Sequence, residues 1–131
     1  MISAGDRFIA HFADGTIAKG FTQDLVPNNP SFHLTLADSG DRRRIMLEDL
    51  KAVFAVKSFE GDSERDDSQE GERPGYGKKI RVVFKDGEEI VGYTTGYAPE
   101  RPAFFMFPVD PASNNARILV VNRFVEQAAF V

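Results

Sequence analysis

The side chains that could carry out chemistry are few in this sequence and lie far apart. Two histidines are present, His11 and His33, and there is no cysteine. Both histidines fall on the outward phase of predicted strands, where two imidazoles could share a metal ion or act as a base. A zinc site takes at least three protein ligands, and no third ligand is apparent. We therefore expect no metal site and no cofactor.

Three consecutive arginines, Arg42, Arg43 and Arg44, form the only dense basic run. Guanidinium groups bind phosphate through paired hydrogen bonds, so the run is a candidate anion-binding site. The neighbouring carboxylates of Asp38 and Asp41 can neutralise these charges. A solvated turn that carries the arginines into water is the alternative explanation.

The residue patterns of common enzymes do not stand out. There is no cysteine nucleophile, and no arrangement of serine, histidine and acid or pair of carboxylates is evident. We therefore expect a protein that is not an enzyme and that works by binding.

The two halves of the chain are similar in sequence over most of their length. An offset of 72 residues pairs Phe12 with Phe84, and after a small length difference residues 42–56 match 116–131. Such self-similarity indicates a tandem duplication with an unrelated insert. The same offset gives these further pairs: Asp14 with Asp86, Gly15 with Gly87, Gly20 with Gly92, Thr22 with Thr94, Pro27 with Pro99, Pro30 with Pro102, Phe32 with Phe104 and Leu34 with Met106.

Each half begins with the pattern of a β-hairpin. Residues 8–12 and 80–84 alternate apolar and polar side chains with the period of two that marks a half-buried strand. An Asp-Gly pair follows in both halves and predicts a tight turn, because glycine accepts a positive φ. The next strand holds Gly20 or Gly92 in its interior, which predicts a sharp bend or a bulge.

Paired prolines follow in both halves. The segments "PNNP", residues 27–30, and "PERP", residues 99–102, cannot lie in a central strand. They predict constrained loops. A third strand leaves each loop, at residues 32–36 in the first half and at 104–107 in the second.

The remainder of each half completes a five-strand unit. A fourth strand is predicted to begin at Ile45 or Ile118, and a fifth ends each half. The segments "LEDL" and "VVNRF" between them are short enough for a single helical turn. The predicted fold class is all-β, with two tandem Sm-like or SH3-like small barrels related by internal duplication. The sequence leaves open whether the barrels pack as one unit.

The acidity of the chain is concentrated between the halves. The net charge is -4, yet residues 58–77 carry seven acidic and two basic residues, and the flanking parts are nearly neutral. A segment this polar cannot bury enough surface to offset its ordering entropy, so it is predicted to be a flexible linker. The expected domains are a first barrel at 1–58, the acidic linker at 59–77 and a second barrel at 78–131.

The Asp-Gly turn, followed by a strand with glycine five residues on, resembles the first motif of Sm-like proteins, which bind RNA as rings. The resemblance implies the small-barrel fold. The acidic residue of that motif does not match, because Asp24 comes too early and Gly96 stands in the second copy. The Arg-Gly pair of the second Sm motif is absent from both halves. Nucleic-acid binding is therefore an alternative that the near-neutral halves disfavour.

Longer phrases resemble a second group of proteins. The segments "FADGTIAKGFTQD", "KKIRVVFKDGEEIVGYTTGY", "PERPAFFMFP" and "SNNARILVVN" are similar to an uncharacterised bacterial family whose members occur alone or beside PilZ and response-regulator domains. The resemblance covers almost the whole chain. It implies an accessory or regulatory role, with no assigned activity.

The third strands of the two halves differ in one respect that bears on function. Where the first half has His33 and Thr35 on the outward phase, the second has Phe105 and Phe107. A strand that is apolar on both faces is covered on both sides. These rings either pack against the first barrel or form a surface for a partner or a second copy.

The proline loops differ as well. Asn28 and Asn29 lie between the prolines of the first half, and Glu100 and Arg101 lie between those of the second. We include these four residues in the candidate partner-binding set, because function is expected where the two copies disagree.

Taken as a sequence, the chain is expected to be a non-catalytic interaction or regulatory module. It would bind a protein partner or associate with itself, and the family resemblance implies a place in bacterial signalling. A small-ligand or nucleotide sensor that uses the arginine run is a further alternative. The lack of cysteine, of a signal-peptide pattern and of a run of about 18 apolar residues predicts a cytoplasmic protein without a membrane segment.

Overall fold

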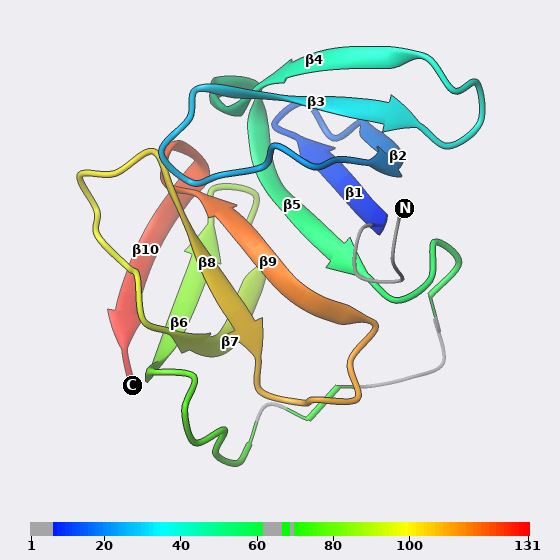
Figure 1. Ribbon diagram of the computed structural model, residues 1–131. Coiled ribbons are helices and arrows are strands. Elements are labelled where there is room, and N and C mark those ends of the chain that lie inside the picture. The colour runs from blue at the N-terminus through cyan, green and yellow to red at the C-terminus, as the bar shows by residue number, and fades with distance from the viewer. Residues whose placement is uncertain (1–6, 62–66, 69) are drawn as a thin grey trace.

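The computed structural model describes residues 7–61, 67–68 and 70–131, and its regular structure is almost entirely β (Figure 1). The first half, up to residue 58, contains β1 (Arg7–Phe12), β2 (Ile17–Phe21), β3 (Ser31–Leu36), β4 (Arg42–Met46), the 3-10 turn η2 (Leu47–Asp49) and β5 (Leu50–Val56). The second half, residues 78–131, contains β6 (Lys78–Phe84), β7 (Glu89–Thr94), β8 (Ala103–Pro108), β9 (Asn115–Val121), η3 (Asn122–Phe124) and β10 (Val125–Phe130). The predicted all-β class is confirmed.

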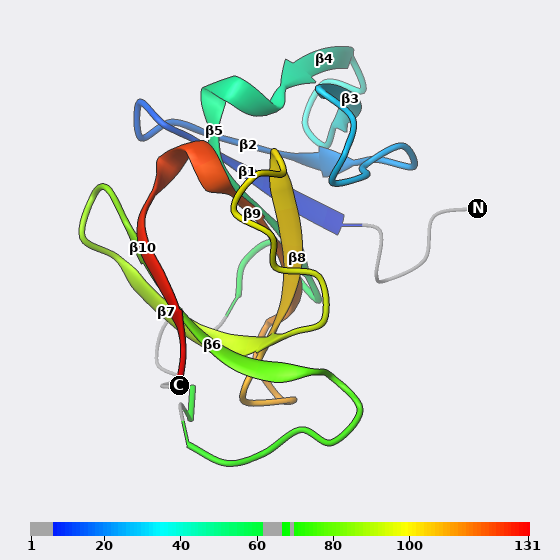
Figure 2. The ribbon, with the colours of Figure 1, turned by 90° about the vertical axis from the view of Figure 1, so that its left-hand side faces the viewer.

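The described strands join in one antiparallel sheet with the order β10-β6-β7-β8-β9-β5-β1-β2-β3-β4. Within it, the first half has the order β5-β1-β2-β3-β4, and the second half repeats that order as β10-β6-β7-β8-β9. Figures 1 and 2 show the first four strands gathered at one end of the molecule and β6, β7 and β10 at the other, with β5, β8 and β9 between them.

The register also corresponds between the halves. Phe8 lies opposite Ala55 in the β1–β5 pair, and Ile80, at the offset of 72, lies opposite Phe130 in the β6–β10 pair. A register shift occurs at the same place in both pairs, beside Phe12 in β1 and beside Val125 in β10. The two halves therefore share their strand order and their pairing.

The two Asp-Gly hairpins form as predicted. Gly15 and Gly87 both have φ of 91°, in the left-handed region that favours glycine. In each turn the carboxylate of the preceding aspartate accepts a hydrogen bond from a backbone N–H two residues on, at 2.9 Å for Asp14 and 3.0 Å for Asp86. This local bond, typical of aspartate in turns, closes both hairpins in the same way.

Gly20 and Gly92 are required for a different reason from the bulge considered above. The register shifts lie elsewhere, in the β1–β5, β6–β10 and β5–β9 pairs. A Cβ atom on Gly20 would lie 2.2 Å from the backbone oxygen of Thr35, and one on Gly92 would lie 2.3 Å from that of Phe107. Glycine is needed because the third strand of each half crosses here at very close range.

Strands β5 and β9 form a wall between two hydrophobic cores. All seven residues of β5 are buried, and successive side chains of a strand point to opposite faces. Ala52, Phe54 and Val56 of β5 join the core of the second half, whereas Leu119 and Val121 of β9 join the core of the first. Each core therefore contains side chains contributed by the other half.

Two details differ from the sequence-based expectations. The fourth strands begin at Arg42 and Asn115, earlier than predicted, so the arginine run lies in a strand and not in a turn, although all three arginines are exposed to solvent. Part of the predicted linker also contacts the second half, since Arg73 donates a hydrogen bond to the Pro108 carbonyl at 2.8 Å. Residues 62–66 and 69 of that linker lie outside the described residues.

Candidate functional site

The junction of the two halves is made by strands that are far apart in the sequence. In the β5–β9 pair, Val53 lies opposite Leu119 and Phe54 lies opposite Ile118. These are large apolar pairs on the two faces of the wall, and cross-strand pairs of this kind stabilise a sheet. The junction therefore fixes how the loops of one half stand relative to those of the other.

A buried lysine adds a second link across the junction. The Lys51 ammonium donates hydrogen bonds to Asp86, at 2.7 Å, and to Glu88, both from the β6–β7 hairpin. The same ammonium lies 4.9 Å from the centre of the Phe84 ring. Burial opposes the charge, but the bonds to Asp86 and Glu88 outweigh it and raise the pKa of Lys51. The lysine therefore stays charged and holds the hairpin of the second half on the first.

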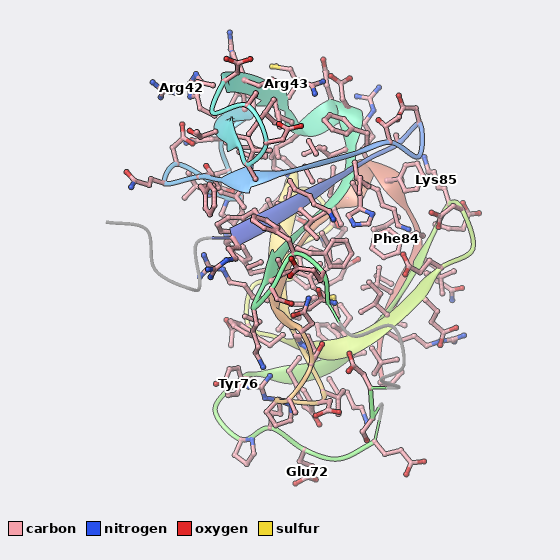
Figure 3. The ribbon with its side chains drawn as sticks, turned by 90° about the vertical axis from the view of Figure 1, so that its right-hand side faces the viewer. Arg42, Arg43, Glu72, Tyr76, Phe84 and Lys85 are labelled. Atoms are coloured by element: carbon pink, nitrogen blue, oxygen red, sulfur yellow. The ribbon has the colours of Figure 1, made fainter. Side chains whose placement is uncertain are left out.

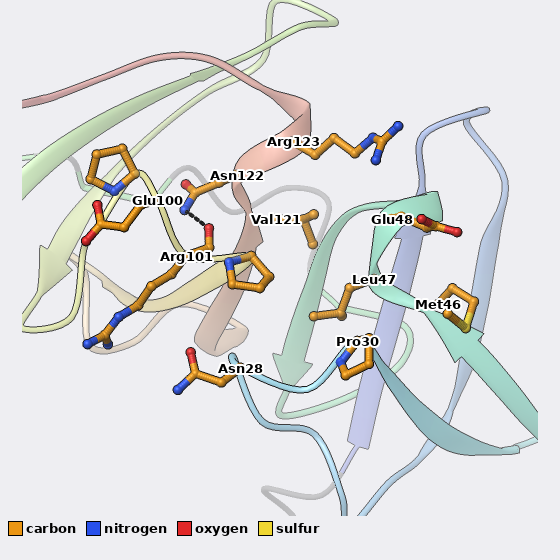
Figure 4. Close-up of a pocket in the computed structure, with 12 residues that line it drawn as sticks. Asn28, Pro30, Met46, Leu47, Glu48, Glu100, Arg101, Val121, Asn122 and Arg123 are labelled. Carbon is orange, nitrogen blue, oxygen red and sulfur yellow. Dashed lines mark hydrogen bonds between the residues drawn. The ribbon is translucent and has the colours of Figure 1, made fainter.

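A pocket of about 500 Å³ opens at this junction, where the two proline loops and the two 3-10 turns meet (Figure 4). It is lined by Asn28, Pro30, Met46, Leu47 and Glu48 from the first half, and by Pro99, Glu100, Arg101, Pro102, Val121, Asn122 and Arg123 from the second. Corresponding elements of both halves thus contribute to a single site.

Backbone hydrogen bonds fix the walls of this junction pocket. Leu47 donates its N–H to the Pro30 carbonyl at 2.9 Å, and Asn122 donates its N–H to the Pro102 carbonyl at 3.0 Å. The Asn122 side-chain amide also donates to the carbonyl of Arg101 at 2.9 Å. Each proline loop is therefore tied to the 3-10 turn of its own half, and prolines restrict the loop further.

The junction pocket has an apolar floor and a charged rim. Leu47 and Val121 are buried at its centre, while Glu48, Glu100, Arg101 and Arg123 are exposed. Glu100 and Arg101 lie on one side of the pocket and Glu48 on the other, with their charged ends directed outward (Figure 4). An apolar base with a few polar groups around it is the usual composition of a binding site.

The structure separates the predicted partner-binding residues. Asn28, Glu100 and Arg101 line the junction pocket, whereas Asn29 is exposed outside its lining. Phe105 is half-buried against the core of the first half, with the Arg117 guanidinium 5.0 Å from its ring centre. Phe107 is half-buried too.

The contacts of the two phenylalanine rings lie within the chain. The Phe107 ring meets the Tyr76 ring edge-to-face, with the ring centres 4.9 Å apart. Packing against the first half is therefore favoured for Phe105 alone, because the Phe107 ring contacts Tyr76 of the predicted linker. Their use as a partner surface stays a prediction.

The arginine run is divided between the two faces of β4. Arg43 lies over the Phe12 ring, with its guanidinium carbon 5.1 Å from the ring centre. Arg42 and Arg44 lie opposite Thr35 and His33 on β3 and share the outer face of the strand pair with them. Anion binding by the run stays a prediction, and Arg43 faces away from the surface that Arg42 and Arg44 share.

The two histidines do not come together. His11 packs edge-to-face on Phe54, with the ring centres 4.6 Å apart, and burial together with the charge of Lys51 lowers the pKa of His11. His33 instead pairs with Asp24 at 2.9 Å. Among the described residues there is no cluster of three side chains that could hold a metal ion, and no helix there is long and apolar enough to cross a membrane.

Lys51 and Asn122 were missed in the sequence because their partners are distant or are backbone groups. One signal was present: a lysine inside the otherwise apolar segment "LKAVFAV". A charge in a strand buried on both faces needs a partner, and Asp86 and Glu88 supply it.

Comparison with known proteins places the chain in a family without assigning an activity. A model described as "Family of unknown function (DUF6982)" matches residues 4–131, and the chain belongs to that family. No curated protein matches the sequence, and no solved structure matches the fold.

Proposed function

We propose that this member of the DUF6982 family is a non-catalytic interaction module that binds an extended segment of a partner protein in the junction pocket. The observation that carries the proposal is the convergence of both proline loops and both 3-10 turns on one pocket. Loops carry function when a rigid scaffold holds them, and here one continuous sheet positions both loops.

The chemistry of the junction pocket defines the partner segment. Its floor offers apolar surface, and its rim offers the carboxylates of Glu48 and Glu100 and the guanidinium groups of Arg101 and Arg123. A segment with an apolar side chain flanked by charged residues of both signs complements this arrangement. Complementary rim charges set specificity more than affinity.

Selection of peptides from a displayed random library tests this proposal. The bait would be the whole protein, compared with the double variant Glu100→Ala/Arg101→Ala. The matched control is Glu72→Ala/Lys85→Ala, which also removes one acid and one base and lies outside the junction pocket. We expect peptides selected on the wild type to bind the pocket variant about tenfold more weakly and the control unchanged.

Two results would contradict pocket binding. Peptides that bind the wild type and the pocket variant equally would move the binding surface elsewhere. A selection that yields no peptide specific to the protein, although it is folded on the support, would remove the proposed function altogether.

The repeated strand order and register further support two finer proposals about origin and shape. We propose that the halves arose by internal duplication and that each corresponds to one small barrel of Sm-like or SH3-like type. The shared offset of 72 residues and the matching strand pairs support this view. A cytoplasmic location and an accessory role in signalling also remain proposals, supported by the lack of cysteine and by the family resemblance.

A second candidate function is self-association through the strands at the two ends of the sheet. The described residues leave β4 and β10 each with one unpaired edge, and their counterparts in the other half, β9 and β5, pair with each other. If two copies joined in the same register, Ala129 would lie opposite Arg43, as Phe54 lies opposite Ile118 within the chain. Because Ala129 is small and Arg43 is large, the two side chains would fit opposite each other in this pairing.

Charge at the exposed Ala129 tests that register. We expect Ala129→Glu to strengthen association, because the new carboxylate would face Arg43 of a second copy, and Ala129→Lys to weaken it. Light scattering after size exclusion, over protein concentrations up to about 1 mM, provides the measurement. A monomer in all three proteins, or the same oligomer regardless of the charge, would rule out this mode of pairing.

A further inference from the structure

The outer face of the β3–β4 pair carries a row of polar side chains that the core does not use. His33 lies opposite Arg44, and Thr35 lies opposite Arg42. Residues directly opposite in an antiparallel pair have neighbouring side chains on the same face. Two guanidinium groups, an imidazole and a hydroxyl therefore share one surface at the end of the molecule that bears Arg42 and Arg43 (Figure 3).

The imidazole of this group is held in position by the β2–β3 loop. Asp24 accepts a hydrogen bond from the His33 backbone N–H at 2.9 Å, and its other carboxylate oxygen lies 2.9 Å from the His33 Nδ1. The Thr22 hydroxyl, which is buried, donates to Asp24 at 3.0 Å. Because Asp24 accepts at Nδ1, the Nε2 atom of His33 is the nitrogen left for a ligand.

The hydrogen bonds also keep Asp24 ionised. Burial opposes its charge, but the bonds from His33 and Thr22 outweigh it and hold the pKa of Asp24 below its ordinary value. The carboxylate is therefore occupied by its own neighbours, and the arginines opposite remain to be neutralised by another group.

A hollow of about 480 Å³ lies over these residues. It is lined by Phe21, Thr22, Gln23, Asp24, His33, Thr35 and Arg42. The Arg42 side chain makes no hydrogen bond, ion pair or ring contact with another described residue, and Arg44 makes one long hydrogen bond, 3.3 Å, to the Ser31 hydroxyl. The cationic groups here are therefore largely free to bind a ligand.

The second half lacks this arrangement, which identifies it as a local feature and not a consequence of the fold. Phe105 and Phe107 stand at the positions of His33 and Thr35, and Leu119 stands at that of Arg44. Tyr76 covers the Phe107 ring. Only the corresponding Arg117 keeps a positive charge, and its guanidinium lies over Phe105.

We propose that the hollow on the outer face of β3–β4 binds the phosphate group of a small phosphorylated molecule. Arg42 lines the hollow and Arg44 lies beside its lining, opposite His33, and both supply guanidinium donors, which match phosphate oxygens in pairs. The Thr35 hydroxyl supplies a further hydrogen-bond donor from the facing strand, with the His33 imidazole beside it. The half-buried ring of Phe21 and the amide of Gln23 line the remaining space, which fits the organic part of such a molecule.

The alternative is that the arginines only protect an edge strand, since charged side chains commonly prevent unwanted strand pairing. That role asks for charge anywhere along β4 and gives no reason for the Asp24–His33 pair or for the hollow. It also treats Arg43 as equivalent to its neighbours, although Arg43 points to Phe12 on the other face. Arg43 therefore serves as the control residue in the test below.

A titration of the full chain followed by ¹⁵N–¹H NMR tests the proposal. The probes are inorganic phosphate, a nucleoside monophosphate and the same nucleoside without phosphate. We expect saturable shifts at residues 22–24, 33–35 and 42–44 with both phosphate-bearing probes and none with the nucleoside. Tighter binding of the monophosphate would indicate that Phe21 and Gln23 contact the organic part, and equal binding would restrict recognition to the phosphate.

Matched arginine variants distinguish phosphate binding at this hollow from a general effect of positive charge. Arg42→Gln/Arg44→Gln is expected to weaken phosphate binding about tenfold or more, whereas Arg43→Gln, on the same strand, should change it less than about threefold. All three side chains are exposed, so folded spectra are expected and serve as the check. Equal weakening by Arg43→Gln, or no saturable shift with either phosphate probe, would overturn the proposal.

Discussion

Replacing Leu119 with alanine is expected to lower the free energy of unfolding by about 2–5 kcal/mol, the range for a fully buried leucine. Leu119 belongs to β9 in the second half, yet it is 0% exposed within the core of the first half. It also lies opposite Val53 across the β5–β9 pair. The variant therefore leaves a cavity at the place where the halves are joined.

The loss should appear in both halves at once. All three tyrosines, Tyr76, Tyr93 and Tyr97, lie after residue 75, so tyrosine fluorescence in urea reports on the second half, while circular dichroism reports on the whole sheet. We expect both signals to shift together. Ile17→Ala is the control, because Ile17 is 51% exposed and its loss should cost less than about 0.5 kcal/mol. A shift in only one signal would contradict the shared core.

Adding a single methyl group at Gly92 is expected to destabilise the protein by about 3 kcal/mol or more. The Cβ atom of Gly92→Ala would lie 2.3 Å from the Phe107 carbonyl oxygen and 2.8 Å from the Met106 methyl group. A methyl group of methionine can move, but the oxygen belongs to the backbone of β8 and is fixed by the sheet. Strands β7 and β8 must therefore move apart where Gly92 and Phe107 meet.

Gly96→Ala is the matched control for this prediction. It makes the same chemical change four residues later, and a Cβ atom there would meet nothing within 4 Å. Its stability should stay within about 0.5 kcal/mol of the wild type. Chemical denaturation of the two variants gives the comparison, and equal losses would show that the close approach of β8 does not set the need for glycine.

The local elements of this fold could be predicted because short-range chemistry specifies them. Asp14-Gly15 and Asp86-Gly87 supply the positive φ that a tight turn needs, and both hairpins form. The prolines of residues 27–30 and 99–102 exclude those segments from the strands, and both are loops in the structure. The two 3-10 turns also lie where the short segments predicted them.

The pairing of β5 with β9 could not be predicted in the same way. Period-two alternation shows which face of a strand is buried, but "LKAVFAV" is apolar on both faces and gives no preferred partner. The paired residues of β9 lie between 59 positions further along the chain, for Val56 and Asn115, and 68 positions, for Ala52 and Val120. The role of Lys51 could not be predicted either, because its partners Asp86 and Glu88 lie 35 and 37 residues further along the chain.

The candidate site was partly accessible from the sequence. Comparing the halves indicated the proline loops and the contrast between Phe105 and His33, and the structure places Asn28, Glu100 and Arg101 in one pocket. Strand β4 begins at Arg42, earlier than Ile45, the start predicted because three consecutive arginines are not typical of a buried strand. Their outward side chains are nevertheless compatible with an edge strand, which is exposed along one side.

The junction pocket depends on the two halves being one folded unit. Whether the halves unfold together can be measured directly. A urea titration followed by ¹⁵N–¹H NMR can compare the loss of the native amide signals of Ala10, in the core of the first half, and Val82, in that of the second. We predict one midpoint for both residues, because β5 and β9 contribute to both cores. Two separated midpoints would show that the halves unfold independently and would contradict the account.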